Sequence, residues 1–232
     1  MKNNSTRTYV IDAVEETISF IRHKYSVDKI SFCIGCVDDI LDSIKKNRTV
    51  LSCLSTLKTY DRYTFSHSIN VFFLSIMIGS ALGLNKNQLH DLGMSALLHD
   101  IGKTLIPKKI LNKKTKLTDL DFSVIKTHTA KGYFYVKEKI SLPDVSFLGI
   151  LHHHEKFDGT GYPVGIKQKN IDIFGRIISI ADVYDAMTSD RPYRKAQTHT
   201  EAIQFIQHNS DKHFDSEIAA VFITDINRAI NL

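Results

Sequence analysis

The stretch INVFFLSIMIGSALGL, at residues 69–84, decides the fold class of this chain. Its large apolar residues recur at the spacing of one helix face: Ile69, Phe72, Phe73 and Ile76. The stretch is slightly short for a membrane span, contains Asn70 and two serines, and begins beside His67. We therefore predict a buried helix in the core of a globular domain, and no membrane span.

Helix-start signals recur along the chain after this stretch. Four of them place a capping side chain at the start of a predicted helix: Asn85 with Gln88, Thr118 with Asp121, Asp172, and Thr198 with Glu201. The helix that starts at Thr118 is expected to carry His128, and a last helix is expected over residues 216–230. Because no sustained strand alternation interrupts these signals, we predict an all-α fold.

Residues 1–55 are predicted to form an N-terminal helical segment, and residues 56–232 the main domain. Apolar side chains at helical spacing make a stripe in the first segment: Val37, Ile40, Leu41 and Ile44. We expect this stripe to pack on the core or on a second copy of the chain rather than to bind a cofactor. A homodimer through the N-terminal helices is therefore one hypothesis.

Composition and charge narrow the class of protein. Hydrophobic residues make up 43% and charged residues 24% of the 232 residues, as in an ordinary globular domain without a disulfide framework. The net charge of +5 favours an anionic partner, but the lysines are spread along the chain without forming a long basic arm, so stable nucleic-acid binding is not expected. Acidic residues replace the apolar run that a signal peptide needs, so we expect a cytoplasmic protein: Asp12, Glu15 and Glu16.

Several histidines and aspartates stand beside or within predicted apolar helices. A single such histidine is usually a hydrogen-bonded core residue. A set spread over several helices instead indicates one shared polar centre, because buried imidazoles and carboxylates are costly without a partner or a metal ion. Mixed nitrogen and oxygen donors suit Fe, Mn or Zn rather than a thiolate site. The set comprises His67, His99, Asp100, His128, His153, His154 and Asp182.

A centre of this kind is suited to phosphoester hydrolysis. A carboxylate can bridge two metal ions, which convert a water molecule to hydroxide near neutral pH and share the charge on a phosphoryl group. Lys103, one turn after the His99–Asp100 pair, would add a positive charge for a phosphate oxygen.

The chain also resembles a known family, the HD-GYP phosphodiesterases, from about residue 58 to residue 232. The resemblance rests on five motifs in the family's order: DRYTFSHS at 61–68, HDIGK at 99–103, HTAKG at 128–132, HHEKFDGTGYP at 153–163 and ADVYDAMTSDRPYR at 181–194. It implies an all-α HD-domain bundle with a C-terminal extension. It also implies hydrolysis of cyclic di-GMP to linear pGpG or to GMP by a metal-activated hydroxide.

The resemblance further implies two divalent metal ions, Fe or Mn, with Asp100 as a bridging ligand. One ion would be held by His67, His99, Asp100 and Asp182, and the other by Asp100, His128, His153 and His154. His152 precedes the motif and is interpreted as neighbouring structure. Some family members carry a glutamate for a third metal four residues before the first histidine, where this chain has Tyr63, so a two-metal centre is predicted.

Substrate contacts are predicted from the same motifs. Lys103 would assist at phosphate, together with the catalytic carboxylate of Asp100. A loop would shape the pocket wall through Asp158, Gly161, Tyr162 and Pro163. Phosphate or guanine would be bound by Arg191, Tyr193 and Arg194.

Two other functions stay open at this point. One is a signalling module that binds a cyclic dinucleotide without hydrolysing it, although the full set of ligand positions argues against a pure binder. The other is hydrolysis of a different cyclic dinucleotide, such as cyclic GMP-AMP. A regulatory protein or a diguanylate cyclase is an expected partner, since the N-terminal segment is too short for a typical sensor domain.

Overall fold

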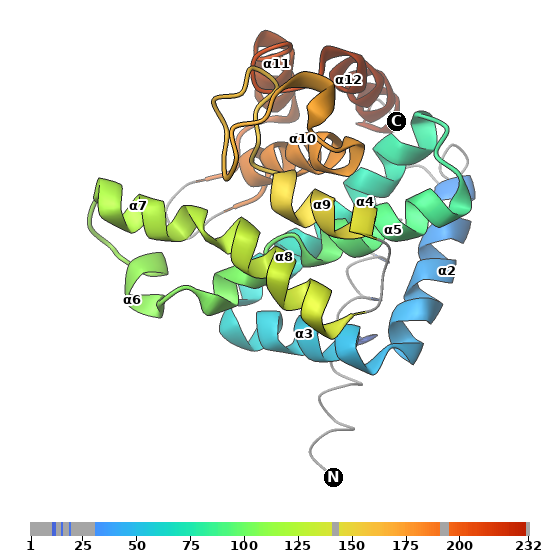
Figure 1. Cartoon of the computed structure of the whole chain (residues 1–232). Helices are drawn as coiled ribbons and strands as arrows, with labels where there is room; N and C mark the ends of the chain where they lie inside the picture. Colours follow the sequence, from blue (N-terminus) through green and yellow to red (C-terminus); the bar gives the residue numbers. More distant parts are fainter. Residues whose placement is uncertain are drawn as a thin grey trace.

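The computed structural model describes residues 31–140, 144–190 and 195–230, together with Ile11, Asp12, Glu15 and Ser19. Within these residues the secondary structure is helical and contains no strand, apart from an isolated bridge between Ser210 and Phe214. The prediction of an all-α fold is therefore confirmed (Figure 1).

The first part of the described chain contains the long apolar helix and the helices that precede and follow it. Its elements are α2 (Ser31–Lys46), α3 (Arg48–Tyr60), α4 (Arg62–Ala81), α5 (Lys86–Leu98), the short 3₁₀ helix η2 (Ile101–Leu105) and α6 (Lys108–Leu111). The second part completes the bundle and adds the C-terminal helices. Its elements are α7 (Asp119–Lys126), α8 (His128–Lys139), α9 (Asp144–His152), the 3₁₀ helix η3 (Gln168–Asn170), α10 (Ile173–Thr188), α11 (His199–His208) and α12 (Ser216–Ile230).

Helix α4 contains most of the stretch 69–84 and lies in the middle of the bundle. It packs against α2, α3, α5, α10 and α12, and 14 of its 20 residues are buried. By length and composition alone α4 could cross a membrane, but 78% of its most apolar window is buried inside the protein. The prediction of a core helix is confirmed. In Figure 1 the helices α11 and α12 lie at one end of the bundle and α3 at the other.

The predicted helix starts agree with the observed caps. Asn85, Thr118 and Thr198 each form a complete capping box, and the carboxylate of Asp172 accepts the backbone N–H of Phe174. The last helix, α12, also has the predicted bounds.

One predicted helix is divided in two. We expected the helix from Thr118 to carry His128, but α7 ends at Lys126 and α8 begins at His128. The imidazole Nδ1 of His128 lies 2.8 Å from the carbonyl oxygen of Ile125, which a continuous helix would offer to the backbone N–H of Thr129. His128 is thereby placed at the beginning of a helix rather than in its middle.

The N-terminal apolar stripe packs on this chain's own core. All four of its residues belong to the main hydrophobic cluster: Val37, Ile40, Leu41 and Ile44. The side chain of Ile40 lies against Gly93 of α5, where an added methyl group would already be 3.1 Å from it. The predicted boundary after residue 55 falls within α3, and the division into two segments stays a prediction. A homodimer would have to use another surface of the N-terminal helices.

We expect Ile40→Ala to lower the free energy of unfolding of the whole chain by about 2–4 kcal/mol, because the change leaves a cavity between α2 and α5. Urea unfolding followed by circular dichroism would show one transition at a lower midpoint. The exposed substitution Asp42→Ala on the same helix is the control and should change the midpoint little. A separate early transition for α2, with the main transition unchanged, would contradict this packing.

Candidate metal centre

Five helices bring the seven predicted ligands to one place. His67 lies in α4, His99 and Asp100 directly follow α5, and His128 begins α8. His153 and His154 follow α9, and Asp182 lies in the middle of α10. All of these residues are at least half-buried, and five of them are fully buried: His67, His99, Asp100, His128 and His153.

The carboxylate of Asp100 lies between two groups of histidines. Its Oδ2 is 3.3 Å from Nε2 of His99 and 3.9 Å from Nε2 of His67. Its Oδ1 is 3.4 Å from Nε2 of His128, on the other side. The two oxygens of one carboxylate thus face different imidazoles, which is the arrangement that a bridging carboxylate needs.

Two groups of three residues have ligand atoms that lie within 4.8 Å of one another. The first group is His67, His99 and Asp100, and the second is His128, His153 and His154. Asp182 reaches both groups, because its Oδ1 is 3.0 Å from Nε2 of His67 and its Oδ2 is 3.9 Å from Nδ1 of His154. The geometry therefore brings all seven predicted ligands together, while the division of these ligands between ions stays a prediction.

Three of the histidines are oriented in the same way by the backbone. In each, Nδ1 donates to the carbonyl oxygen of the residue three positions earlier, at 2.7–2.8 Å: His99 to Ala96, His128 to Ile125 and His153 to Ile150. A proton on Nδ1 leaves the lone pair on Nε2, which points to the centre. Such hydrogen bonds to the distal ring nitrogen are typical of metal-binding histidines.

His67 is oriented by a carboxylate instead. Its Nδ1 lies 2.6 Å from Oδ2 of Asp185, whose Oδ1 accepts hydrogen bonds from Asn70 Nδ2 at 2.8 Å and from Ser189 Oγ at 3.0 Å. We did not predict Asp185 from the sequence. The available signal was its position three residues after Asp182 in the apolar helix, which places both carboxylates on the same face.

Burial keeps most of the imidazoles neutral. It lowers the pKa of His128 to about 4 and the pKa of His154 to about 3, and it lowers the pKa of His153 as well. Burial also acts to lower the pKa of His67, but hydrogen bonds to Asp182 and Asp185 outweigh it and raise this pKa to about 9. The side of the centre around His67 therefore carries an excess of negative charge that a divalent cation would offset.

The donor atoms fit divalent metal ions. Nε2 of His99 and Oδ1 of Asp100 are both buried and have no hydrogen-bond partner among the described residues. Leaving such atoms unsatisfied costs about 1–3 kcal/mol each, so a stable protein normally supplies a partner. Nitrogen and carboxylate donors of this kind bind first-row divalent ions.

Lys103 reaches the centre from η2. Its Nζ donates to Oδ2 of Asp100 at 2.6 Å, and its side chain is 28% exposed. Burial would raise the pKa of Asp100, but the charges of Lys103 and His99 hold it well below its usual range. The lysine is thus placed at the solvent side of the carboxylate, where an anionic ligand would arrive.

The loop after His154 closes one wall of the centre. Glu155 is buried, and its carboxylate accepts the backbone N–H groups of Val164 at 2.7 Å and Gly165 at 3.0 Å. Gly161 is required here, because a Cβ atom at this position would lie 2.2 Å from the backbone nitrogen of Lys156. The sequence motif had drawn attention to the glycine, whereas the anchoring role of Glu155 was missed.

Of the predicted substrate contacts in the described residues, Tyr162 lies at the centre, whereas Asp158 and Pro163 are exposed. The ring of Tyr162 packs on the ring of His154, with 4.8 Å between centroids, and burial raises the pKa of its hydroxyl, which stays protonated. Pro163 is exposed beside it. Asp158 is exposed and caps a turn by accepting from Thr160, so its substrate role stays a prediction. The remaining predicted contacts lie outside the described residues: Arg191, Tyr193 and Arg194.

Two neighbouring residues have structural contacts. Nδ1 of His152 accepts the backbone N–H of Asp172 at 3.4 Å, as expected for a residue outside the ligand set. The ring of Tyr63 stacks on the ring of His67, with 6.1 Å between centroids and 5° between planes. Tyr63 therefore occupies the space beside His67, and the number of metal ions stays a prediction.

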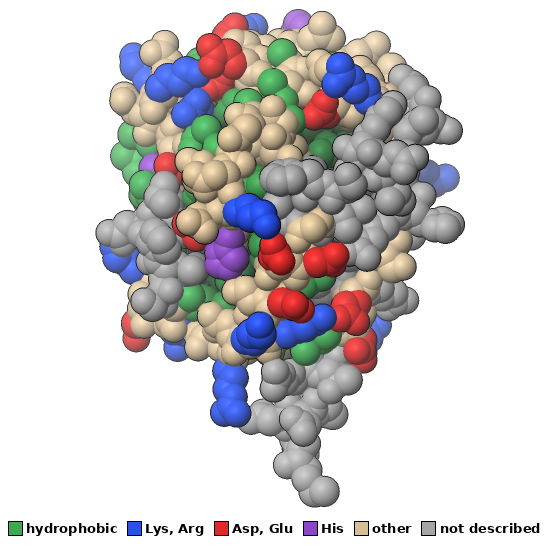
Figure 2. All heavy atoms as spheres, turned by 90° about the vertical axis from the view of Figure 1, so that its right-hand side faces the viewer, with side chains coloured by type: hydrophobic (Ala, Val, Ile, Leu, Met, Phe, Trp, Pro, Cys, Tyr) green, Lys and Arg blue, Asp and Glu red, His purple; other side chains and the backbone are tan. Residues whose placement is uncertain are grey.

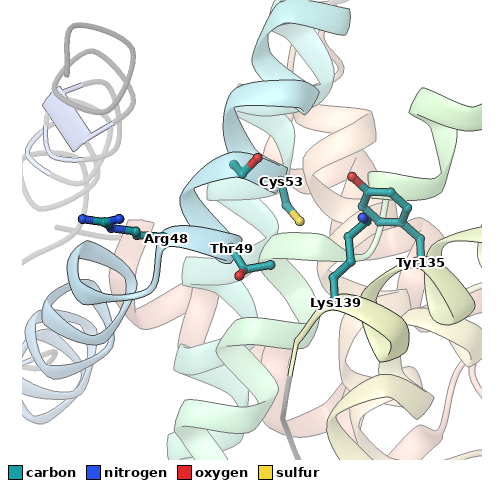
Figure 3. Close-up of a pocket in the computed structure, with 6 residues that line it drawn as sticks. Arg48, Thr49, Cys53, Tyr135 and Lys139 are labelled. Carbon is teal, nitrogen blue, oxygen red and sulfur yellow. The ribbon is translucent and has the colours of Figure 1, made fainter. Parts of the chain in front are cut away.

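A separate cavity of about 390 Å³ lies between α3 and the end of α8 (Figure 3). Its lining includes Cys53, Tyr135 and Lys139, and none of the candidate metal ligands. The thiol of Cys53 is buried, and burial raises its pKa. This cavity is consequently not the candidate metal centre.

Comparison with known proteins identifies the class of protein. Residues 41–218 match the family described as HD domain, so the chain belongs to the HD domain family. This match confirms the resemblance drawn from the motifs.

Individual relatives refine this assignment. The chain is 40% identical over 190 residues to a cyclic di-GMP phosphodiesterase of Pseudomonas aeruginosa, a match that covers 81% of this chain and 45% of that protein. It is 35% identical over 163 residues to 3'3'-cGAMP-specific phosphodiesterase 1 of Vibrio cholerae, covering 70% of this chain and 38% of the relative. The chain thus spans about half the length, or less, of these curated relatives.

Solved structures support the fold. An HDG"Y"P protein from Bdellovibrio bacteriovorus superposes with a TM-score of 0.62 at 20% identity, covering 96% of this chain and 70% of the other. At this level of identity the similarity establishes a shared HD-type helical fold.

We expect Asp185→Asn to weaken metal binding about 10–100-fold, because the amide keeps the shape of the side chain but no longer holds His67 with a negative charge. Metal titration of the chelated protein, with metal content measured by mass spectrometry, checks this. Asp225→Asn in α12, where the half-buried carboxylate pairs with Arg228 and with no candidate ligand, is the control. Unchanged affinity in Asp185→Asn would show that Asp185 does not support the centre.

Proposed function

We propose that this chain is a metal-dependent phosphodiesterase of the HD-GYP type that hydrolyses a cyclic dinucleotide, with cyclic di-GMP as its substrate. The observation that carries the proposal is Asp100, whose two oxygens face two separate groups of imidazoles. A two-ion centre is suited to phosphodiester hydrolysis, since two cations can stabilise both the attacking and the leaving oxygen. The printed names of the relatives favour the same substrate class.

The residues would divide between two ions, Fe or Mn. His67, His99 and Asp182 would complete one site and His128, His153 and His154 the other, with Asp100 shared. Divalent ions bound here would supply positive charge for a phosphoryl oxygen and lower the pKa of a water molecule. The imidazoles of His99, His128 and His153, held by their Nδ1 hydrogen bonds, would direct their Nε2 lone pairs to these ions.

The chain's own groups would bind and orient the dinucleotide. Lys103 lies on the solvent side of Asp100 and would place its ammonium group beside a non-bridging phosphate oxygen. The ring of Tyr162, beside His154, would limit the space at the centre, and its protonated hydroxyl can donate a hydrogen bond. Glu155 keeps this wall in place by holding the backbone of the loop.

Cyclic GMP-AMP is the second candidate substrate, because relatives named for this dinucleotide match the chain at 34–35% identity. The residues predicted to bind guanine lie outside the described residues. Turnover assays with both dinucleotides would therefore measure the preference between cyclic di-GMP and cyclic GMP-AMP. The end product, a cytoplasmic location, and a regulatory or diguanylate cyclase partner stay predictions. A binding module without turnover is the alternative that the first experiment excludes or supports.

We expect the Mn(II)- or Fe(II)-loaded protein to convert cyclic di-GMP to linear pGpG or GMP, and Asp100→Ala to lose both metal and turnover. A bridging ligand serves both ions, so its removal should reduce the metal content to near zero. Anaerobic purification, metal analysis and chromatography of the products over time test this, with Asp225→Ala as a matched control. Full metal content without turnover in the unmodified protein would favour the binding module.

We expect Lys103→Gln to retain metal and to lower kcat by about 100-fold, as for loss of one charge-stabilising donor. The glutamine side chain is one atom shorter; it removes the positive charge and keeps an N–H donor. Metal content and kcat are measured on the same preparation. Loss of metal in Lys103→Gln would show that the lysine holds Asp100 for metal binding rather than acting on the substrate.

A further inference from the structure

The positive charge of this chain is concentrated in one segment, which we call the basic arm. The arm runs from Lys103 to Lys126 and contains seven lysines and two aspartates, a net charge of +5. This equals the net charge of the whole chain, so all other residues together are neutral. The sequence-based expectation that the lysines form no basic arm is therefore wrong. These lysines occur singly or in pairs with up to nine other residues between them, so no continuous basic run marks the arm.

The basic arm lies outside the hydrophobic core. None of residues 107–127 is buried, and neither α6 nor α7 contains a buried residue. Figure 1 shows these two helices projecting from one side of the bundle. On the opposite side, shown in Figure 2, acidic and basic side chains are mixed. Helix α2 contributes acidic residues that pair with lysines, as in Lys86–Asp39 and Lys45–Asp42.

Both ends of the basic arm meet the metal centre. It starts at Lys103, whose Nζ is 2.6 Å from Oδ2 of Asp100, and it ends two residues before His128. At this second end, Nζ of Lys126 lies 5.3 Å from the ring centroid of Tyr162, and that ring packs on His154. The arm therefore connects the candidate ligands Asp100 and His128, and its last lysine lies over Tyr162 in the wall of the site.

We propose that the basic arm captures the dianionic cyclic dinucleotide and raises the rate at which it reaches the metal centre. This inference rests on the proposed function. An exposed group of like charges beside a site attracts an oppositely charged substrate, and the attraction weakens as salt shortens the screening length. The lysines of the arm beyond Lys103 act before the chemical step, so their charges affect association and not kcat.

The arm also has an apolar side that could contact a lipid surface, since Leu120 is 76% and Phe122 47% exposed. Phe122 is partly covered by Lys126, whose Nζ lies 4.8 Å from its ring centroid. The substrate is the favoured occupant, because the two ends of the arm lie at the ligands rather than at a remote surface.

The test uses two triple variants with the same change of charge. The arm variant carries Lys109→Gln, Lys114→Gln and Lys116→Gln, at three exposed positions. The control variant carries Lys46→Gln, Lys86→Gln and Lys139→Gln, also exposed. Lys86 and Lys139 stand at the far ends of α5 and α8, roughly 15–20 Å along each helix from His99 and His128.

The association rate constant of a cyclic di-GMP carrying a neutral fluorescent mant group is measured by stopped flow with the Mn(II)-loaded proteins. We expect the arm variant to bind about fivefold more slowly than the control variant at low ionic strength, with the difference lost near 0.5 M salt. In turnover assays, kcat/KM should fall by the same factor while kcat stays unchanged.

The outcomes separate this inference from the proposed function. Equal association rates for the two variants at every salt concentration would overturn the capture role, as would failure of the unmodified protein to bind the labelled dinucleotide. Slower association of the arm variant in a protein that hydrolyses no cyclic dinucleotide would support capture and refute the proposed reaction. If the arm variant instead lost only sedimentation with phosphatidylglycerol vesicles, the arm would be a lipid-contact surface and the inference would be wrong.

Discussion

The burial of one carboxylate, that of Asp100, is the constraint on which the rest of the structure depends. An isolated buried carboxylate is costly, so the fold must surround it with positive charge and hydrogen-bond donors. Lys103 from η2, His99 at the end of α5 and His128 at the start of α8 lie within 3.4 Å of its oxygens. Gly102 allows this approach, because a Cβ atom there would lie 1.9 Å from the carbonyl oxygen of His128. The positions of three helical segments are therefore linked to one side chain.

The all-α fold and the clustering of the candidate ligands could be predicted because both depend on residue type and order. Apolar spacing identified the central helix α4, and the motifs alone indicated that His67 and His153 lie near a shared centre. Capping residues such as Asn85 could also be predicted, because a cap depends on residues within one helical turn. These features are local in the chain or repeated in a recognisable order.

The features that escaped prediction depend on what a residue faces in space. Asp185 supports His67 across a separation of 118 residues, so its position three residues after Asp182 indicates a shared helix face but not its partner. Glu155 was visible in the motif, but its hydrogen bonds to Val164 and Gly165 exist only once the loop has closed. The break between α7 and α8 follows from a bond of the His128 ring to the backbone, which helix propensity does not report.

The spread of the ligands along the chain also has a consequence for biosynthesis. The first ligand, His67, and the last, Asp182, are separated by almost half of the 232 residues. Because the chain emerges from the ribosome starting at its N-terminus, Asp100 and the histidines around it leave the exit tunnel well before α10 exists. During that interval Asp182 and Asp185 are not yet available to hold His67. The candidate centre is therefore incomplete until α10 has been synthesised, and binding of a metal ion by the full set would come late in folding.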